Sequence, residues 1–371
     1  MEVRNNYKEC LTNLACSIRK YFGLEYKHNT LEYVDKILEE KQPKNVVIIL
    51  YDGMGSRILD RVLPKESFFN VNRYKEITTV FPATTTAATT SIRTGLNPVE
   101  HGWMGWNVYL KPFDKIITLF RNNEKNSEEI YQEYVEHGKD YLVTNTIVSD
   151  INDAGNYKAY DHFPFGDNPY KDLDEMLGLI EKECTEDGKK FIYGYDPEPD
   201  HTMHENGADS EIVKELIEER NRKTQELCNK LEDTVVIVVA DHGHLLVDRI
   251  QLTDYPEITS LLERNTSLEP RATSFKVIPG KEQEFVEKFN KEFGEDFKLY
   301  SKQEVIDSKL FGDGEENPIY RDAIGDYIAI AYGKRALLMP GDEDLISMHA
   351  GYTDDEIYVP LIIVEKWKKK M

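Results

Sequence analysis

Acidic and imidazole side chains recur next to short apolar runs in this 371-residue sequence. The groups are Asp52, the pair Asp200 and His204, the pair Asp241 and His242, and His349, which precedes the last run. A further run is followed by the turn Thr84-Thr85-Thr86. Carboxylates and imidazoles are good ligands for zinc and manganese, and metal coordination can hold a threonine hydroxyl as a nucleophile. This combination of residues predicts metal-dependent chemistry.

Each group also has a simpler interpretation when it is taken alone. Asp52 begins an Asp-Gly turn, and Asp241 can cap a helix beside a surface histidine. The threonines can also be helix N-caps. Asp200 and His204 are four residues apart, so on a helix they face the same side. Because each group follows an apolar run or, for His349, lies shortly before one, a single shared site explains them together.

The apolar runs are typical of strands buried on both faces, as in a parallel sheet. They are Val46–Leu50, Ile77–Phe81, Tyr141–Val148, Phe191–Tyr195, Thr234–Val239 and Tyr358–Val364. Polar, helix-favouring segments separate them, and this alternation indicates a doubly wound α/β fold. In such folds ligands bind beyond the carboxyl ends of the strands, so the polar groups are expected at one edge of the sheet.

Residues 247–330 have a different pattern, with expected strands at 273–278 and 297–300 and expected helices at 281–293 and 303–310. We interpret this segment as a small inserted α/β subdomain. The catalytic domain then comprises residues 1–246 and 331–371.

The chain carries 68 acidic against 46 basic residues, with a formal charge of −22. This balance argues against nucleic-acid polymers and anionic membranes as partners, because both require clustered positive charge. Two groups of three ligands suggest two divalent ions, which suit in-line displacement at phosphorus. The positive charge of such ions would make the local electrostatic potential favourable for an anion, despite the negative charge of the protein. A small phosphate ester is therefore the expected substrate. The histidine content favours zinc, and manganese or a mixed pair fits the same ligands.

Targeting signals are not recognisable in the sequence. The segment Met1 to Tyr21 is interrupted by charges, and no run approaches the about 18 apolar residues of a membrane span. The four cysteines (Cys10, Cys16, Cys184 and Cys228) form no CxxC pair, which indicates reduced thiols. We therefore predict a cytoplasmic protein whose basic tail, Lys366 to Lys370, is a short solvated end. The oligomeric state is not indicated.

The motifs, taken in order, resemble the alkaline phosphatase superfamily, and most of all its type I phosphodiesterase/nucleotide pyrophosphatase branch. They are Asp52-Gly53, Phe81-Pro82-Ala83-Thr84-Thr85, Thr94-Gly95-Leu96, His101-Gly102, Asp200-x-x-x-His204, Asp241-His242-Gly243 and His349-x-Gly351. The resemblance implies a central, mostly parallel sheet flanked by helices. It also implies a metal-dependent phosphoester hydrolase.

The resemblance further implies a role for each ligand. Asp52, Asp241 and His242 would hold one ion together with Thr85, and the other ion would be held by Asp200, His204 and His349. Thr85 would attack phosphorus and form a phosphothreonine intermediate, which water then hydrolyses.

Several assignments around the site stay open. Thr84 and Thr86 are alternative nucleophiles by position. An asparagine that binds phosphoryl oxygens is expected after the His-Gly turn, where the family's spacing gives Trp106 and the next residue is Asn107. His201 and His244 are expected either to support the ligands or to lie at the surface. His28, His137 and His162 are expected to lie at the surface.

Specificity is expected to reside in Trp103 to Tyr109, in Asp161 to Tyr170 and in the inserted region, which contains Arg271. Arg271 is expected to contact a phosphate or an acidic group, or to form a surface salt bridge. The leading hypothesis is a phosphodiesterase or nucleotide pyrophosphatase. A phosphomonoesterase or phosphonate hydrolase is the alternative, and a metal- or anion-binding protein without turnover is a distant third.

Overall fold

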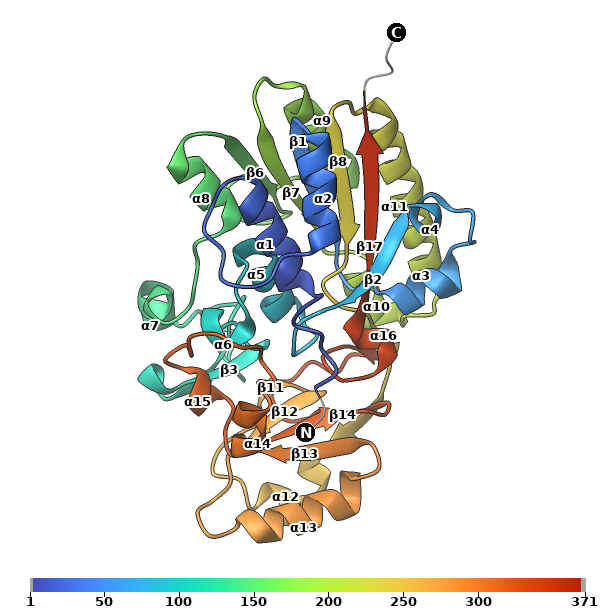
Figure 1. The fold of residues 1–371 in the computed structure, drawn as a ribbon. Coiled ribbons are helices and arrows are strands. Elements are labelled where there is room, and N and C mark those ends of the chain that lie inside the picture. The colour runs from blue at the N-terminus through green and yellow to red at the C-terminus, as the bar shows by residue number, and fades with distance from the viewer. Residues whose placement is uncertain (1–2, 368–371) are drawn as a thin grey trace.

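Six strands form the central sheet, in the order β2-β17-β8-β1-β7-β6 (Figure 1). The structure is a computed structural model that describes residues 3–367, so positions 368–370 of the basic tail lie outside the described residues. The strands are β1 (Asn45–Tyr51), β2 (Arg73–Thr78), β6 (Lys158–His162), β7 (Lys190–Asp196), β8 (Thr234–Val239) and β17 (Tyr358–Lys366). Only β17 runs against its neighbours within this sheet. The predicted mostly parallel sheet is confirmed.

Strands β1, β7 and β8 are buried at every position. Their continuous apolar sequence suits this location, because helices cover both faces of the sheet (Figure 1). The longer helices are α1 (Leu11–Tyr21), α2 (Glu32–Lys41), α3 (Ser56–Val62), α5 (Thr85–Thr94), α8 (Ile147–Ala154), α9 (Leu173–Thr185), α10 (Asp200–Asn206) and α11 (Glu211–Lys230). Shorter ones are α4 (Phe68–Val71), α6 (Pro98–His101) and α7 (Gln132–His137). None of the helices within residues 3–367 is long and apolar enough to cross a bilayer.

The strand expected over Tyr141–Val148 is absent from the described structure, where this segment leads into α8. Strand β6 instead pairs with β7. It is an edge strand, and only Ala159 among its five residues is buried. The sequence of β6 lacks a continuous apolar run. The search for such runs therefore missed β6 and gave the segment 141–148 instead.

A second sheet lies below the first in Figure 1, in the order β13-β14-β12-β11-β3-β4-β5, and all of its pairings are antiparallel. Its strands are β3 (Asn107–Leu110), β4 (Lys115–Thr118), β5 (Asn123–Glu124), β11 (Ser267–Glu269), β12 (Ala272–Phe275), β13 (Phe297–Ser301) and β14 (Tyr327–Ala331). Residues 247–330 thus share this sheet with three strands from residues 107–124. The domain division at residues 247–330 stays a prediction.

Helix α13 (Glu282–Phe293) buries Phe285, Phe289 and Phe293, which recur every four residues along one face. The other elements here are α12 (Pro256–Thr259), α14 (Lys302–Asp307), α15 (Tyr320–Ala323) and α16 (Asp354–Ile357). Two small ribbons pair β10 (Asp248–Gln251) with β15 (Arg335–Leu338), and β9 (Leu245–Leu246) with β16 (Ser347–Met348). All four cysteines are buried and unpaired, in line with the expected thiols.

Candidate active site

The carboxyl ends of β1, β7 and β8 bring three buried aspartates to one edge of the central sheet. Asp52 directly follows β1, Asp200 begins α10 after β7, and Asp241 follows β8. The Asp200 amide donates to the Asp52 carbonyl oxygen at 3.1 Å. The edge location expected from the sequence is therefore observed.

Two glycines allow this close approach of three loops. A Cβ atom on Gly53, whose φ is +71°, would lie 2.9 Å from the Cβ of Asp200. One on Gly243 would lie 1.8 Å from the Asp355 carbonyl oxygen. A side chain on Gly53 would push the Asp52 and Asp200 loops apart, and one on Gly243 would push the Asp241 loop away from α16, which explains the Asp-Gly and Asp-His-Gly patterns.

The first cluster contains Asp52, Asp241, His242 and Thr85. His242 Nε2 lies 3.3 Å from Asp52 Oδ1, 3.5 Å from Asp241 Oδ2 and 3.3 Å from Thr85 Oγ1. Asp241 Oδ1 accepts the amides of Gly53 and His242 at 3.0 Å, which leaves Oδ2 facing the cluster. Tyr195 donates its hydroxyl to Asp52 Oδ2 at 2.5 Å, which similarly leaves Oδ1 free.

Thr85 is the first residue of α5, and of the three threonines it is the one whose hydroxyl meets this cluster. Thr84 donates its hydroxyl to Glu269 Oε1 at 2.7 Å. The Thr86 hydroxyl is buried without a hydrogen-bond partner in the described structure. The geometry therefore favours Thr85 over its two neighbours.

The second cluster contains Asp200, His204, His349 and also His244, with donor atoms all within 4.8 Å of one another. Asp200 Oδ2 lies 3.2 Å from His204 Nε2, and Oδ1 lies 3.2 Å from His244 Nε2 and 3.9 Å from His349 Nε2. Ligand bonds of about 2.0–2.2 Å imply separations of roughly 3.3 Å between ligands in a tetrahedral site. The ribbon of β9 with β16 brings His244 beside His349. Its full burial could not be read from the sequence.

All four histidines of the two clusters are held through Nδ1. The partners are the carbonyl oxygens of Ser347, Gly243 and Ala83 for His204, His242 and His349, and Ser347 Oγ for His244, at 2.8–3.0 Å. A carbonyl only accepts, so Nδ1 of those three histidines carries the proton and Nε2 presents a lone pair to the cluster. This is the usual arrangement of metal-ligating histidines.

Four buried atoms that face the clusters have no hydrogen-bond partner in the described structure: Asp52 Oδ1, Asp200 Oδ1, Asp241 Oδ2 and His244 Nε2. The ion-pair partners of the three aspartates within residues 3–367 are all histidines. Burial, together with the Asp241 and Asp200 carboxylates, raises the pKa of Asp52 well above its ordinary value. Unpaired buried polar atoms are costly, and divalent cations would satisfy all four. The residues therefore fit bound metal ions.

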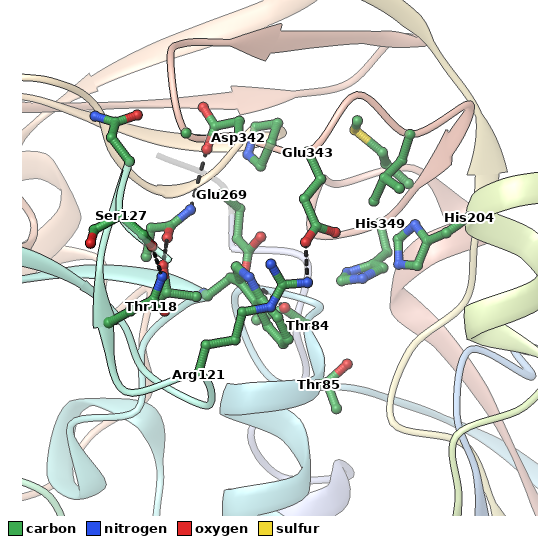
Figure 2. A pocket seen from close by; sticks show the side chains of 18 of the residues that line it. Thr84, Thr85, Thr118, Arg121, Ser127, His204, Glu269, Asp342, Glu343 and His349 are labelled. Carbon is green, nitrogen blue, oxygen red and sulfur yellow. Dashed lines mark hydrogen bonds and ion pairs between the residues drawn. The ribbon is translucent and has the colours of Figure 1, made fainter. Parts of the chain in front are cut away.

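A pocket of about 350 Å³ opens beside Thr85, His204 and His349 (Figure 2). Asn107 lines it, donates Nδ2 to Asp342 Oδ1 at 3.2 Å and accepts the Thr118 hydroxyl at 2.7 Å. Trp106 lines it as well, whereas residues 161–170 contribute no described residue to it. The carboxylates of Glu269, Asp342 and Glu343 were not predicted, because they come from segments distant in the sequence. Burial raises the pKa of Glu269 to about 7.

Arg271 is fully buried and donates to both carboxylate oxygens of Glu356, at 2.6 and 2.8 Å. Arg271 does not line the pocket, and its burial excludes the expected surface salt bridge, so its acidic partner belongs to the fold and not to a substrate. The Gly351 amide also donates to Glu356, at 2.7 Å. The ion pair therefore secures the loop that carries His349.

The remaining histidines differ in exposure. His137 and His201 are exposed, as expected. His28 and His162 are mostly buried, at 11% side-chain exposure, and pair with Glu100 and Glu183, so their surface assignment is wrong.

Comparison with known proteins gives an independent view of the fold. The model of the type I phosphodiesterase/nucleotide pyrophosphatase family matches residues 46–339, which include every predicted ligand except His349. A comparison with curated protein sequences found no significant match.

Solved structures with a similar fold include human ectonucleotide pyrophosphatase/phosphodiesterase 5, with 19% identity and a TM-score of 0.65 over 86% of this chain and 87% of that chain. The murine protein, an inactive threonine-to-alanine variant in complex with AMP, has 18% identity and a TM-score of 0.64 over 85% and 87%. Phosphonoacetate hydrolase from Sinorhizobium meliloti, with phosphonoformate, has 14% identity and a TM-score of 0.62 over 89% and 92%. The family match covers most of the chain, and the chain therefore belongs to the type I phosphodiesterase/nucleotide pyrophosphatase family, as a hydrolase of phosphoester or phosphoanhydride bonds.

Proposed function

We propose that the protein is a two-metal phosphodiesterase or nucleotide pyrophosphatase with Thr85 as its nucleophile. The observation that carries this proposal is the set of four buried atoms in the two clusters that have no hydrogen-bond partner within residues 3–367. Three of them belong to carboxylates that no lysine or arginine of the described structure neutralises. A site with this charge deficit suits divalent cations and, with them, an anionic phosphoryl group.

The two clusters divide the proposed ligands. Asp52, Asp241, His242 and Thr85 hold one ion, and Asp200, His204 and His349 hold the other. Bound divalent ions supply charge stabilisation to the attacking and leaving oxygens of an in-line displacement at phosphorus. The imidazoles among the donors favour zinc, with manganese or a mixed pair as alternatives.

Thr85 attacks phosphorus through Oγ1, and the departing alcohol or phosphate leaves on the opposite side. The chain is then esterified at Thr85, and water hydrolyses this phosphothreonine to release the product and restore the hydroxyl. The Thr84 side chain is engaged by Glu269 and does not cap α5, so first-turn amides of this helix are available to phosphoryl oxygens. Asn107 is proposed as a further donor to these oxygens.

A small nucleotide-like diester is the favoured substrate. The murine relative is described as inactive after a threonine-to-alanine change and in complex with AMP, which supports both the nucleophile type and the substrate class. A phosphonate is the second candidate, because the structure of phosphonoacetate hydrolase has a similar fold. The cytoplasmic location stays a prediction.

The proposal is tested by hydrolysis of p-nitrophenyl phosphate, bis-p-nitrophenyl phosphate, a nucleoside 5′-p-nitrophenyl phosphate and phosphonoacetate, with zinc or manganese supplied. Preferential hydrolysis of the diesters supports it, and so does loss of activity with a chelator and recovery with metal. No hydrolysis of any ester by metal-loaded protein contradicts the hydrolase assignment. A strong preference for the monoester or the phosphonate contradicts the diesterase assignment.

A further inference from the structure

The pocket beside Thr85 has an excess of negative charge on its walls. Its lining includes four carboxylates, Glu128, Glu269, Asp342 and Glu343, against one arginine, Arg121, and the two proposed ligands His204 and His349. These residues come from the loop around β5, from β11 and from residues 341–348, so they surround the space rather than cluster at one point (Figure 2). The ester group that accompanies the phosphoryl group must meet these walls.

The nearby cations are already paired. Arg121 forms an ion pair with Glu343. Lys125 pairs with Asp342 at 2.8 Å, and the side chains of Lys125 and Asp342 are at most 5% exposed. Glu269 and Glu128 have no basic partner within the described part of the chain. A second anionic group on a substrate would therefore need to break an existing ion pair to find a cation.

Of the two carboxylate oxygens of Glu269, only Oε1 accepts hydrogen bonds within residues 3–367. Oε1 accepts the Thr84 hydroxyl and the Trp106 amide, each at 2.7 Å. Oε2 accepts no hydrogen bond within residues 3–367 and is accessible from the pocket. Figure 2 shows Glu269 between the His204–His349 end of the pocket and the Asp342 end. This oxygen is open to the pocket, so a ligand group that donates a hydrogen bond can reach it without displacing an existing contact.

On the basis of the proposed function, we infer that this pocket selects phosphodiesters whose ester group carries no further negative charge and donates hydrogen bonds, as an amino alcohol or a polyol does. Glu269 is the specificity-determining residue, because it offers an acceptor beside the nucleophile loop. Trp106 adds an aromatic wall that suits the carbon skeleton or an ammonium group. Esters in which the group that stays on phosphorus carries an additional carboxylate or phosphate are rejected by like charge.

Three 4-nitrophenyl phosphodiesters of nearly equal size test this inference: the 2-aminoethyl, 2-hydroxyethyl and carboxymethyl esters. Their kcat/KM values are measured through nitrophenolate release with the wild-type protein, Glu269→Gln and the matched control Glu129→Gln. The amide oxygen introduced by Glu269→Gln can still accept from Thr84 and Trp106, and circular dichroism checks that the variant folds. Glu129 is exposed and outside the pocket lining, so its variant removes one charge from the same region without touching the walls.

We expect wild-type kcat/KM for the aminoethyl and hydroxyethyl esters to exceed that for the carboxymethyl ester at least ~10-fold, because like charges repel in a partly desolvated site. Glu269→Gln should reduce the aminoethyl-to-carboxymethyl ratio at least ~5-fold, whereas Glu129→Gln should change it less than ~2-fold. Equal rates for all three esters, a preference for the carboxymethyl ester, or an unchanged ratio in Glu269→Gln would overturn the inference. Failure to hydrolyse any of the three contradicts the proposed function instead.

Discussion

The central sheet and the loops beside the second sheet each supply one side of the site, and the side chains on these two sides differ strongly in burial. Asp52 and Asp241 follow strands that are buried at every position, and they are at most 2% exposed themselves. Across the pocket, Arg121 and Glu343 project from loops with side chains 58% and 41% exposed. Buried, hydrogen-bonded side chains hold a fixed geometry, whereas exposed loop residues tolerate change.

This difference in burial suggests that catalysis and substrate selection depend on different parts of the molecule. Chemistry at phosphorus needs ligands placed within a fraction of an ångström, which the parallel strands provide. Selection among ester groups depends on walls that can vary without disturbing those ligands. Substitutions at the central edge should therefore abolish turnover, whereas those in the pocket wall should change the preference for substrates.

Asp200→Asn should strongly reduce both turnover and metal binding. We expect kcat to fall ~100- to 1000-fold and about one ion per chain to be lost, because Asp200 contacts three histidines of its cluster. Metal analysis and steady-state kinetics check this, with the fully exposed Asp187→Asn as control. Retention of both ions at wild-type affinity would break the assignment of this cluster.

Glu356→Gln should destabilise the fold by about 3–5 kcal/mol, because it leaves the buried Arg271 charge unpaired. Denaturant unfolding measures this loss. The neighbouring Asp355→Asn is the control, because it breaks an exposed pair with Arg61 that is worth below about 1 kcal/mol. Equal losses in the two variants would show that burial of the pair is not what matters.

The ion pair of Arg271 and Glu356 also makes the stability of the fold depend on pH, in a direction that follows from the pKa of Glu356. Burial alone would raise the pKa of Glu356, but Arg271 outweighs it and places the pKa below its ordinary value. Its contribution is therefore fully present above the pKa of the unfolded chain and is lost as the pH falls through the folded value. The stability gap between the wild type and Glu356→Gln should shrink in acid. A gap that widens in acid would reverse the sign assigned to this group.

Asn107→Ala should lower kcat/KM by about 10-fold with unchanged ion content, since a neutral donor to the phosphoryl group is removed. Thr118→Val is the companion variant, because it removes only the hydroxyl that orients the amide. A smaller loss in Thr118→Val than in Asn107→Ala is expected. Wild-type kinetics in Asn107→Ala would remove this residue from the proposed site.

Arg121→Ala should have the smallest effect, because its ion pair with Glu343 is exposed. We expect kcat/KM to change less than ~3-fold for a phosphodiester whose alcohol group carries no charge. Kinetics with the hydroxyethyl ester provide the measurement. A loss above ~30-fold would place Arg121 in contact with the phosphoryl group. It would contradict the division between catalysis at the buried edge and substrate selection at the pocket wall.

The sequence predicted the central edge far better than the pocket wall, for a physical reason. Asp52 and Asp241 follow continuous apolar strands, so local pattern and topology together place them. Glu269 and Asp342 meet only through the pairing of distant antiparallel strands and loops, which no local pattern reveals. His244 lies two residues from a recognised ligand, but only the β9–β16 ribbon shows that it is buried against Asp200. The misplaced strand at 141–148 reflects the same limit, because β6 is a partly exposed edge strand without an apolar run.

The central claim is that Thr85 performs nucleophilic attack at a two-metal edge. The most direct test compares Thr85→Ser with Thr85→Ala on a nucleoside 5′-p-nitrophenyl phosphate, with ion content measured in both. Loss of the hydroxyl should reduce kcat at least ~1000-fold in Thr85→Ala, whereas Thr85→Ser should stay within ~10-fold of the wild type. Turnover in Thr85→Ala close to the wild-type rate would contradict the account.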